Sequence, residues 1–108
     1  MDEGRWASGR WQVKEGRADE FIERWSEWLG STSQRVAGFR SAKLLRAEGD
    51  PLRFTSIAEW DDDSSLKAWK TSEGFRENIE SCKELCDEFL GGDYDVAASF
   101  SAPSAVRS

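Results

Sequence analysis

Two tryptophans that lie close together in the sequence are the first candidates for chemistry. Trp60 ends an alternating stretch of residues, 52–60, and Trp69 follows nine residues later in a segment with helical spacing. The acidic run at residues 61–63 between them offers side chains that cap a helix. A strand that leads into a short helix carrying an indole predicts a flat, apolar cavity at this corner, with room for a planar ring.

The residue types that perform most acid–base and metal chemistry are missing or poorly placed. The chain contains no histidine, which removes the usual general base, the commonest metal ligand and the axial ligand of most haem sites. Its two cysteines, Cys82 and Cys86, stand four residues apart in a helical pattern and are expected to be buried free thiols. Consecutive aspartates project differently, so residues 61–63 are expected to act as caps. We predict no metal site and no cofactor.

Composition limits the class of protein and its partners. The 108 residues carry a formal net charge of -6, which argues against a nucleic-acid or anionic-membrane partner, because both require a concentrated basic surface. No apolar run has the length of a membrane span, and the opening MDEGRW is no secretory leader, so we expect a cytoplasmic protein. We expect a single domain over residues 1–100 and a flexible C-terminal tail over 101–108. So small a domain gains from oligomerisation.

The pattern before the tryptophan corner alternates and then becomes helical. Residues 6–13 predict a strand with Trp11 on one face and Arg10 on the other. From residue 17 the apolar spacing is helical, and this helix is expected to end within residues 30–33. Its apolar stripe comprises Phe21, Trp25 and Trp28.

A hairpin and a short helix surround the corner itself. Residues 38–47 and 52–60 are expected to pair as antiparallel strands, because Glu-Gly-Asp-Pro at residues 48–51 supplies turn chemistry. The short helix that follows carries Leu66 and Trp69. In this arrangement Trp60 anchors the corner.

The rest of the chain predicts a long helix and a last strand. Apolar residues that step by four and three predict a helix from Ser72, with Gly91 and Gly92 as its C-terminal stop. A strand is expected over residues 93–100, with Tyr94 on one side. The apolar stripe of the helix comprises Phe75, Ile79, Cys82, Cys86 and Phe89.

The expected order is strand, helix, strand, strand, helix, helix, strand. This order predicts an α+β protein with a ferredoxin-like split βαβ arrangement, in which helices cover one face of an antiparallel sheet. The other face of the sheet then needs a cover of its own.

Three segments, in this order, resemble the antibiotic biosynthesis monooxygenase family. The segments are WQVKEGRADEF at residues 11–21, GFRSAKLLRAEGDPLRF at 38–54 and PLRFTSIAEWDDDSSLKAWKTSEGF at 51–75. The family consists of small dimeric α+β barrels, in which two sheets face each other across the dimer. The resemblance therefore implies a homodimer that covers the second face of the sheet.

One branch of this family degrades haem with an asparagine on the first strand, a tryptophan and a more distant histidine. Aligned on Gly16 and Trp69, this sequence has Gly9 at the asparagine position and Ile79 at the histidine position. The resemblance therefore argues against haem degradation here.

Another branch oxidises phenolic or quinol-like polycyclic substrates with molecular oxygen and no metal or flavin, since the substrate anion itself delivers an electron to oxygen. The resemblance implies a cofactor-independent monooxygenase that acts on an aromatic phenol, quinol or polyketide-like substrate. Trp69 matches the tryptophan that lines the family's cavity and is the candidate catalytic residue, although it would serve equally as a core residue. The expected substrate-binding residues are Trp11, Phe75, Ile79, Trp25 and Tyr94.

Cationic side chains are candidates to stabilise a phenolate or superoxide, or else are solvated surface charges. Arg10 is expected to face the opposite sheet of the dimer instead. The other candidates are Arg40, Lys43, Arg46, Arg53 and Arg76.

Two alternatives to the monooxygenase remain open. The first is a non-catalytic dimeric barrel that binds a small hydrophobic ligand or is purely structural, and the second is another reaction, such as isomerisation or dehydration of a small carbonyl compound. Contact between Trp69 and Trp11 with no space beside them favours the non-catalytic barrel. An open cavity that reaches a buried arginine or tyrosine favours the enzyme.

Overall fold

The computed structural model describes residues 4–103, and its elements follow the predicted order. Within these residues no helix is long and apolar enough to cross a membrane. The elements are β1 (Arg5–Val13), α1 (Ala18–Arg35), β2 (Phe39–Ala47), β3 (Asp50–Trp60), α2 (Asp63–Lys70), α3 (Glu73–Lys83) and β4 (Cys86–Asp95).

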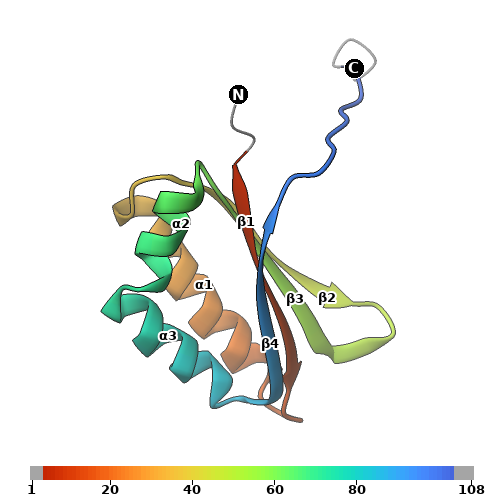
Figure 1. Cartoon of the computed structure of the whole chain (residues 1–108). Coiled ribbons are helices and arrows are strands. Elements are labelled where there is room, and N and C mark those ends of the chain that lie inside the picture. Colours follow the sequence, from red (N-terminus) through yellow and green to blue (C-terminus); the bar gives the residue numbers. More distant parts are fainter. Residues whose placement is uncertain (1–3, 104–108) are drawn as a thin grey trace.

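The four strands form one antiparallel sheet in the order β2-β3-β1-β4, and the predicted hairpin is the pair β2 and β3. All three helices lie on the same side of this sheet, and the turn between β2 and β3 extends beyond them (Figure 1). This is the predicted α+β ferredoxin-like fold.

The alternation of side chains along the strands decides which residues meet the helices. On β1, Trp11 and Val13 are buried against the helical layer, and on β3 the same is true of Phe54 and Trp60. The helices contribute apolar stripes to this core, because their residues recur with helical spacing. The aromatic residues are thereby concentrated in the layer between helices and sheet.

Helix α1 is longer than the sequence predicts. It continues through Gly30 and ends at Arg35, and within it Thr32 Oγ1 donates a hydrogen bond to the Trp28 carbonyl. The chain turns at Gly38, which has a φ of 86°. A Cβ there would lie 2.2 Å from Ser65 Oγ, so only glycine fits this position.

The prediction of a helix running from Ser72 to the glycine pair is wrong in its second half. Helix α3 ends at Lys83, and the strand predicted at 93–100 is β4, which begins at Cys86 and ends at Asp95. A bulge explains the error. Glu88 pairs with Gln12 but Cys86 pairs with Val13, so Asp87 is an extra residue.

The bulge gives a strand the apolar spacing of a helix, since it turns Cys86 and Phe89, three residues apart, toward the same face. Gly91 and Gly92 lie within β4 and terminate no helix. Of the predicted tail, residues 101–103 form no helix or strand, and residues 104–108 lie outside the described residues.

The face of the sheet that points away from the helices carries a mixture of apolar and charged side chains. Trp6 and Tyr94 are paired on this face, and so are Arg10 and Leu90. Three of its apolar residues are exposed: Leu45 at 48%, Tyr94 at 57% and Leu90 at 64%. In Figure 1 no helix or strand of the described residues covers this side of the sheet.

Candidate active site

A cavity of about 440 Å³ lies between the helices and the sheet. All three helices and strands β1, β3 and β4 contribute lining residues. Its volume falls within the range of roughly 300–1,000 Å³ that is usual for sites of small organic molecules. The predicted cavity at the tryptophan corner therefore exists, and it extends along the sheet.

The sheet leaves space for the cavity because the inward-facing side chains are small where three neighbouring strands pair side by side. Ser56 on β3, Gly9 on β1 and Gly91 on β4 stand directly opposite one another across three neighbouring strands. Ala7 and Ala58 form the next inward-facing pair of β1 and β3. This floor of small residues opposes large rings on the helices, so the two layers do not fill the volume between them.

One end of the floor is organised by a hydrogen bond between Trp11 and Ser56. The Trp11 indole Nε1 donates to Ser56 Oγ at 3.0 Å, and both residues are buried. A Cβ on Gly9 would lie 2.8 Å from each of these two atoms and 3.1 Å from the Phe89 ring. Only glycine at position 9 is therefore compatible with this placement of the Trp11 ring.

Trp69 belongs to a cluster of rings at the helical wall. Its ring stacks on Trp28 with centroids 5.7 Å apart and 25° between planes. Phe75 meets it edge-on at 4.8 Å, and the Trp60 ring lies 4.8 Å away. Trp69 and Trp28 are 6% and 7% exposed, so their rings present a wall that water reaches little.

Local capping fixes the helix that carries Trp69. Asp62 accepts a hydrogen bond from the Ser65 backbone N–H at 2.8 Å, and this contact lowers the pKa of its carboxyl. Leu66 is fully buried below the helix, and the Ser72 hydroxyl donates to the Trp69 carbonyl at 2.7 Å before capping α3. The helix α2 is thus held at both ends.

Two lysines are the charged residues that line the cavity within the described part of the chain. Lys70 Nζ lies 6.0 Å from the centroid of the Phe75 ring and pairs with Asp93 on β4. Lys83 Nζ lies 5.7 Å from the centroid of the Phe89 ring. The described residues contribute no acidic side chain to the lining.

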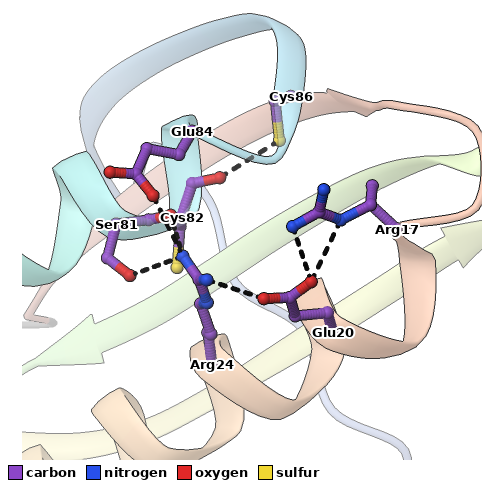
Figure 2. Close-up of polar contacts among 7 residues, drawn as sticks. All are labelled: Arg17, Glu20, Arg24, Ser81, Cys82, Glu84 and Cys86. Atoms are coloured by element: carbon purple, nitrogen blue, oxygen red, sulfur yellow. Dashed lines mark hydrogen bonds and ion pairs between the residues drawn. The ribbon is translucent and has the colours of Figure 1, made fainter.

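A separate polar network holds α1 against α3 (Figure 2). Arg24 donates to the Ser81 carbonyl at 2.9 Å and to its hydroxyl at 3.0 Å, and it pairs with Glu84 at 3.3 Å and with Glu20 at 2.6 Å. Arg17 also bonds Glu20, and these arginines lower the pKa of its carboxyl. The network fixes the last turns of α3 beside the cavity.

The structure brings most of the predicted site residues together. Tyr94 is the exception, because it lies on the opposite face of the sheet and does not line the cavity. Trp69 and Trp11 make no ring contact with each other and have the cavity beside them, yet no arginine or tyrosine of the described residues lines it. The predicted residues that line the cavity are Trp69, Trp11, Phe75, Ile79 and Trp25.

The cations expected from the sequence lie elsewhere. Arg40 pairs with Asp61 at 2.6 Å and with Glu59 at 3.3 Å, and the guanidinium of Arg46 lies 4.9 Å from the centroid of the Phe54 ring. None of the five proposed cations lines the cavity; these are Arg40, Lys43, Arg46, Arg53 and Arg76.

Sequence reasoning missed Lys70 and Lys83 as lining residues. A signal for Lys83 was present, because it follows Ile79 by four residues on the same helical face. No comparable pattern marks Lys70, which reaches the cavity through the length of its side chain.

Metal-binding and thiol chemistry find little support in this cavity. Among residues 4–103 no three His, Cys, Asp or Glu side chains gather in a way that could hold a metal ion. Cys82 and Cys86 are free, and burial raises the pKa of Cys82 to about 12 and that of Cys86 to about 11. At neutral pH both remain protonated and weakly nucleophilic.

The family model for antibiotic biosynthesis monooxygenases matches residues 7–81, which include Trp11, Trp69 and Ile79 of the cavity. The chain belongs to the antibiotic biosynthesis monooxygenase family. No curated protein matches its sequence.

Solved structures share the fold of this family member. SnoaB from Streptomyces nogalater, a cofactor-independent oxygenase, superposes with a TM-score of 0.81 at 20% identity, covering 94% of this chain and 100% of SnoaB. A conserved protein from Methanosarcina mazei Go1 gives 0.76 at 22% identity, covering 85% of this chain and 91% of that one. A protein from Pseudomonas aeruginosa gives 0.73 at 18% identity, with 91% and 98% covered.

The two positions that the resemblance singled out for haem handling both line the cavity of this family member. Gly9 has no room for a side chain beside Trp11 and Ser56, and Ile79 offers no ligand atom. The residues present therefore do not fit the haem-degrading arrangement.

Proposed function

We propose that this protein is a cofactor-independent monooxygenase that oxidises a planar phenol, quinol or polyketide-like compound with molecular oxygen. The observation that carries the proposal is the aromatic cavity of about 440 Å³ at the position where the family resemblance expects it. Its walls provide stacking surfaces for fused rings.

The reaction follows from the chemistry of an anthrone-type substrate. Loss of a proton gives an aromatic enolate, which transfers one electron to oxygen and forms a radical pair with superoxide. The pair combines to a peroxide, and loss of water leaves a quinone, so a CH₂ group and O₂ become C=O and H₂O. The described residues offer no carboxylate in the cavity to accept the first proton, so the substrate enters already ionised.

Within this proposal Trp69 is the catalytic residue and a wall for the substrate ring. Its ring lines the cavity, and within the proposal its indole N–H donates to a substrate oxygen. The expected substrate contacts are Trp11, Trp25, Phe75 and Ile79. Tyr94 has no part in this cavity.

The proposal is tested by oxygen consumption. The purified, chelator-treated protein is mixed with a panel of anthrones and hydroquinones in an oxygen-electrode cell, and quinone formation is followed by absorbance. We expect turnover of at least one member, with one O₂ consumed per quinone. Absence of oxygen uptake across the panel, with SnoaB active under the same conditions, overturns the proposal.

Variants at two neighbouring tryptophans locate the site. Trp69→Phe keeps an apolar ring but removes the N–H, and we expect kcat/KM to fall about 10- to 100-fold, the value of a hydrogen bond to a charged group. Trp60→Phe is the matched control, because Trp60 touches the Trp69 ring but does not line the cavity. Equal losses in both variants would assign Trp69 to packing.

A non-catalytic ligand-binding barrel is the second candidate. The observation that favours it is the absence of carboxylate, arginine and tyrosine from the described lining. It predicts that planar aromatic compounds quench tryptophan fluorescence while none of them is oxidised above the rate without protein.

The functional unit that we propose is a homodimer in the cytoplasm. The uncovered face of the sheet presents Leu45, Leu90 and Tyr94 together with charges of both signs, which suits a self-complementary contact between two copies. The two free thiols fit a reducing compartment.

A further inference from the structure

The charge of the cavity is opposite to the charge of the protein. The chain has 21 acidic and 15 basic residues, yet the charged side chains of the described lining are Lys70 and Lys83 and include no acid. A low-dielectric cavity concentrates the field of such groups, because protein walls screen less than water. The cavity is therefore a local positive site on an acidic protein.

Lys83 is the less constrained of the two cations. Its Nζ lies 5.7 Å from the Phe89 ring centroid, and Phe89 itself lines the cavity. Its carboxylate neighbour is Glu80 at 3.5 Å, one turn earlier on the same helix and with a side chain 65% exposed. A solvated pair of this kind contributes little, so the ammonium keeps hydrogen-bonding capacity for another oxyanion.

Lys70 is held more firmly. It follows Trp69 directly at the end of α2, lies near the Phe75 ring, and donates to Asp93 on β4. This ion pair connects α2 to β4 next to the cavity, and its lysine side chain is 28% exposed. Asp93 offsets the charge of Lys70, so this pair fixes the end of α2 and leaves Lys83 as the cation with free hydrogen-bonding capacity.

We propose that the ligand of this cavity is an aromatic oxyanion, a phenolate or a carboxylate on fused rings, and that Lys83 binds its oxygen. This inference rests on the proposed function and names its substrate class. The fused rings lie between the floor around Gly9 and the wall around Trp69, and the oxyanion lies toward α3.

Lys83 also supplies what the oxygenase chemistry requires. A nearby cation lowers the pKa of a phenol, so its ammonium group favours the ionised substrate that donates an electron to oxygen. The cavity then needs no carboxylate or histidine base of its own, because water outside the cavity takes the proton. Lys83 is in this account a specificity residue.

Binding to a matched pair of probes tests the inference without any oxidation. The probes are 2-anthracenecarboxylate and 2-anthracenemethanol, which share the ring system and differ in charge, and binding to the full-length protein is measured by quenching of tryptophan fluorescence. We expect the carboxylate to bind about 3- to 10-fold more tightly at low salt. Added NaCl reduces this preference, because it rests on charge.

Variants assign the preference to one residue. Lys83→Met keeps the aliphatic stem and is expected to remove most of the preference, whereas Lys83→Arg retains it and Lys83→Glu reverses it. Lys67→Met is the matched control, because Lys67 lies on α2, pairs with Asp63 and does not line the cavity. Equal affinity for the two probes, or equal effects of Lys83→Met and Lys67→Met, overturns the inference.

The result of the binding experiment can be told apart from the result of the oxygen-consumption experiment. A charge preference that depends on Lys83, found in a protein that consumes no oxygen, supports the anion site and removes the oxygenase. Oxygen uptake with no preference between the probes supports the oxygenase and removes the anion site.

Discussion

The Trp11 indole donates a hydrogen bond to Ser56 Oγ through the space that a side chain at position 9 would occupy. The Nε1 to Oγ distance is 3.0 Å, and the two residues come from neighbouring strands, 45 positions apart in sequence. This contact fixes the Trp11 indole beside the small residues of the cavity floor. Two predictions follow from it.

Gly9→Ala should destabilise the fold. The added methyl group would lie 2.8 Å from both Trp11 Nε1 and Ser56 Oγ, so one of them has to move. Overpacking of this kind costs about 1–3 kcal/mol, measured as the free energy of unfolding in urea. Gly30→Ala is the control, because nothing lies within 4 Å of its Cβ position and alanine favours the helix. An unchanged urea midpoint of unfolding for Gly9→Ala would show that the Trp11 ring is free to move.

Ser56→Ala should leave the Trp11 N–H buried without an acceptor. We expect a loss of about 1–3 kcal/mol in the free energy of unfolding. A double-mutant cycle with Trp11→Phe isolates the contact, because in that background the donor is absent and Ser56→Ala should cost much less. Additive losses in the double variant would show that the two residues contribute independently.

Leu90→Asp should weaken the proposed homodimer. Leu90 is 64% exposed on the uncovered face of the sheet, and a charge there has to be desolvated when a second copy binds. Light scattering after size exclusion is expected to report twice the chain mass of 12.2 kDa for the parent protein and a shift toward the single chain for the variant. Ser31→Asp, at an exposed position on α1, is the control. A parent protein that runs as a monomer rejects the dimer.

Acid should destabilise the protein through two carboxylates. Hydrogen bonds from Arg17 lower the pKa of Glu20 below 4.5, and those from Ser65 lower the pKa of Asp62 below 3.8. The folded chain therefore binds fewer protons than the unfolded one in this range. The stability that these groups contribute is fully present above about pH 4.5 and declines as the pH falls through the folded pKa values.

The measurement is the urea concentration at the midpoint of unfolding, determined at several pH values between about pH 6 and pH 3. Glu20→Gln and Asp62→Asn should each make the fall with acid shallower. Glu77→Gln is the control, because Glu77 is an exposed residue of α3 whose side chain makes no hydrogen bond or ion pair with the described residues. Identical pH profiles for all of the variants would place the acid sensitivity elsewhere.

Short-range patterns in the sequence predict much of the fold. Period-two alternation located the strands at β1 and β3 and assigned Trp11 and Trp60 to the buried face, and helical spacing located α1 and the start of α3. The resemblance to the family also implied that Trp69, Phe75 and Ile79 lie beside a cavity, and all three line the one in the structure.

The tertiary structure decided what depends on neighbours distant in sequence. A bulge against β1 gave Cys86 and Phe89 a helix-like spacing within a strand, and only the pairing of β4 with β1 reveals it. Tyr94 was assigned to the cavity but faces the other side, since the same pairing sets its orientation. Lys70 and Lys83 enter the site through long side chains whose direction is set by packing, and therefore local pattern determines the frame of this site while its charge is determined by the assembled fold.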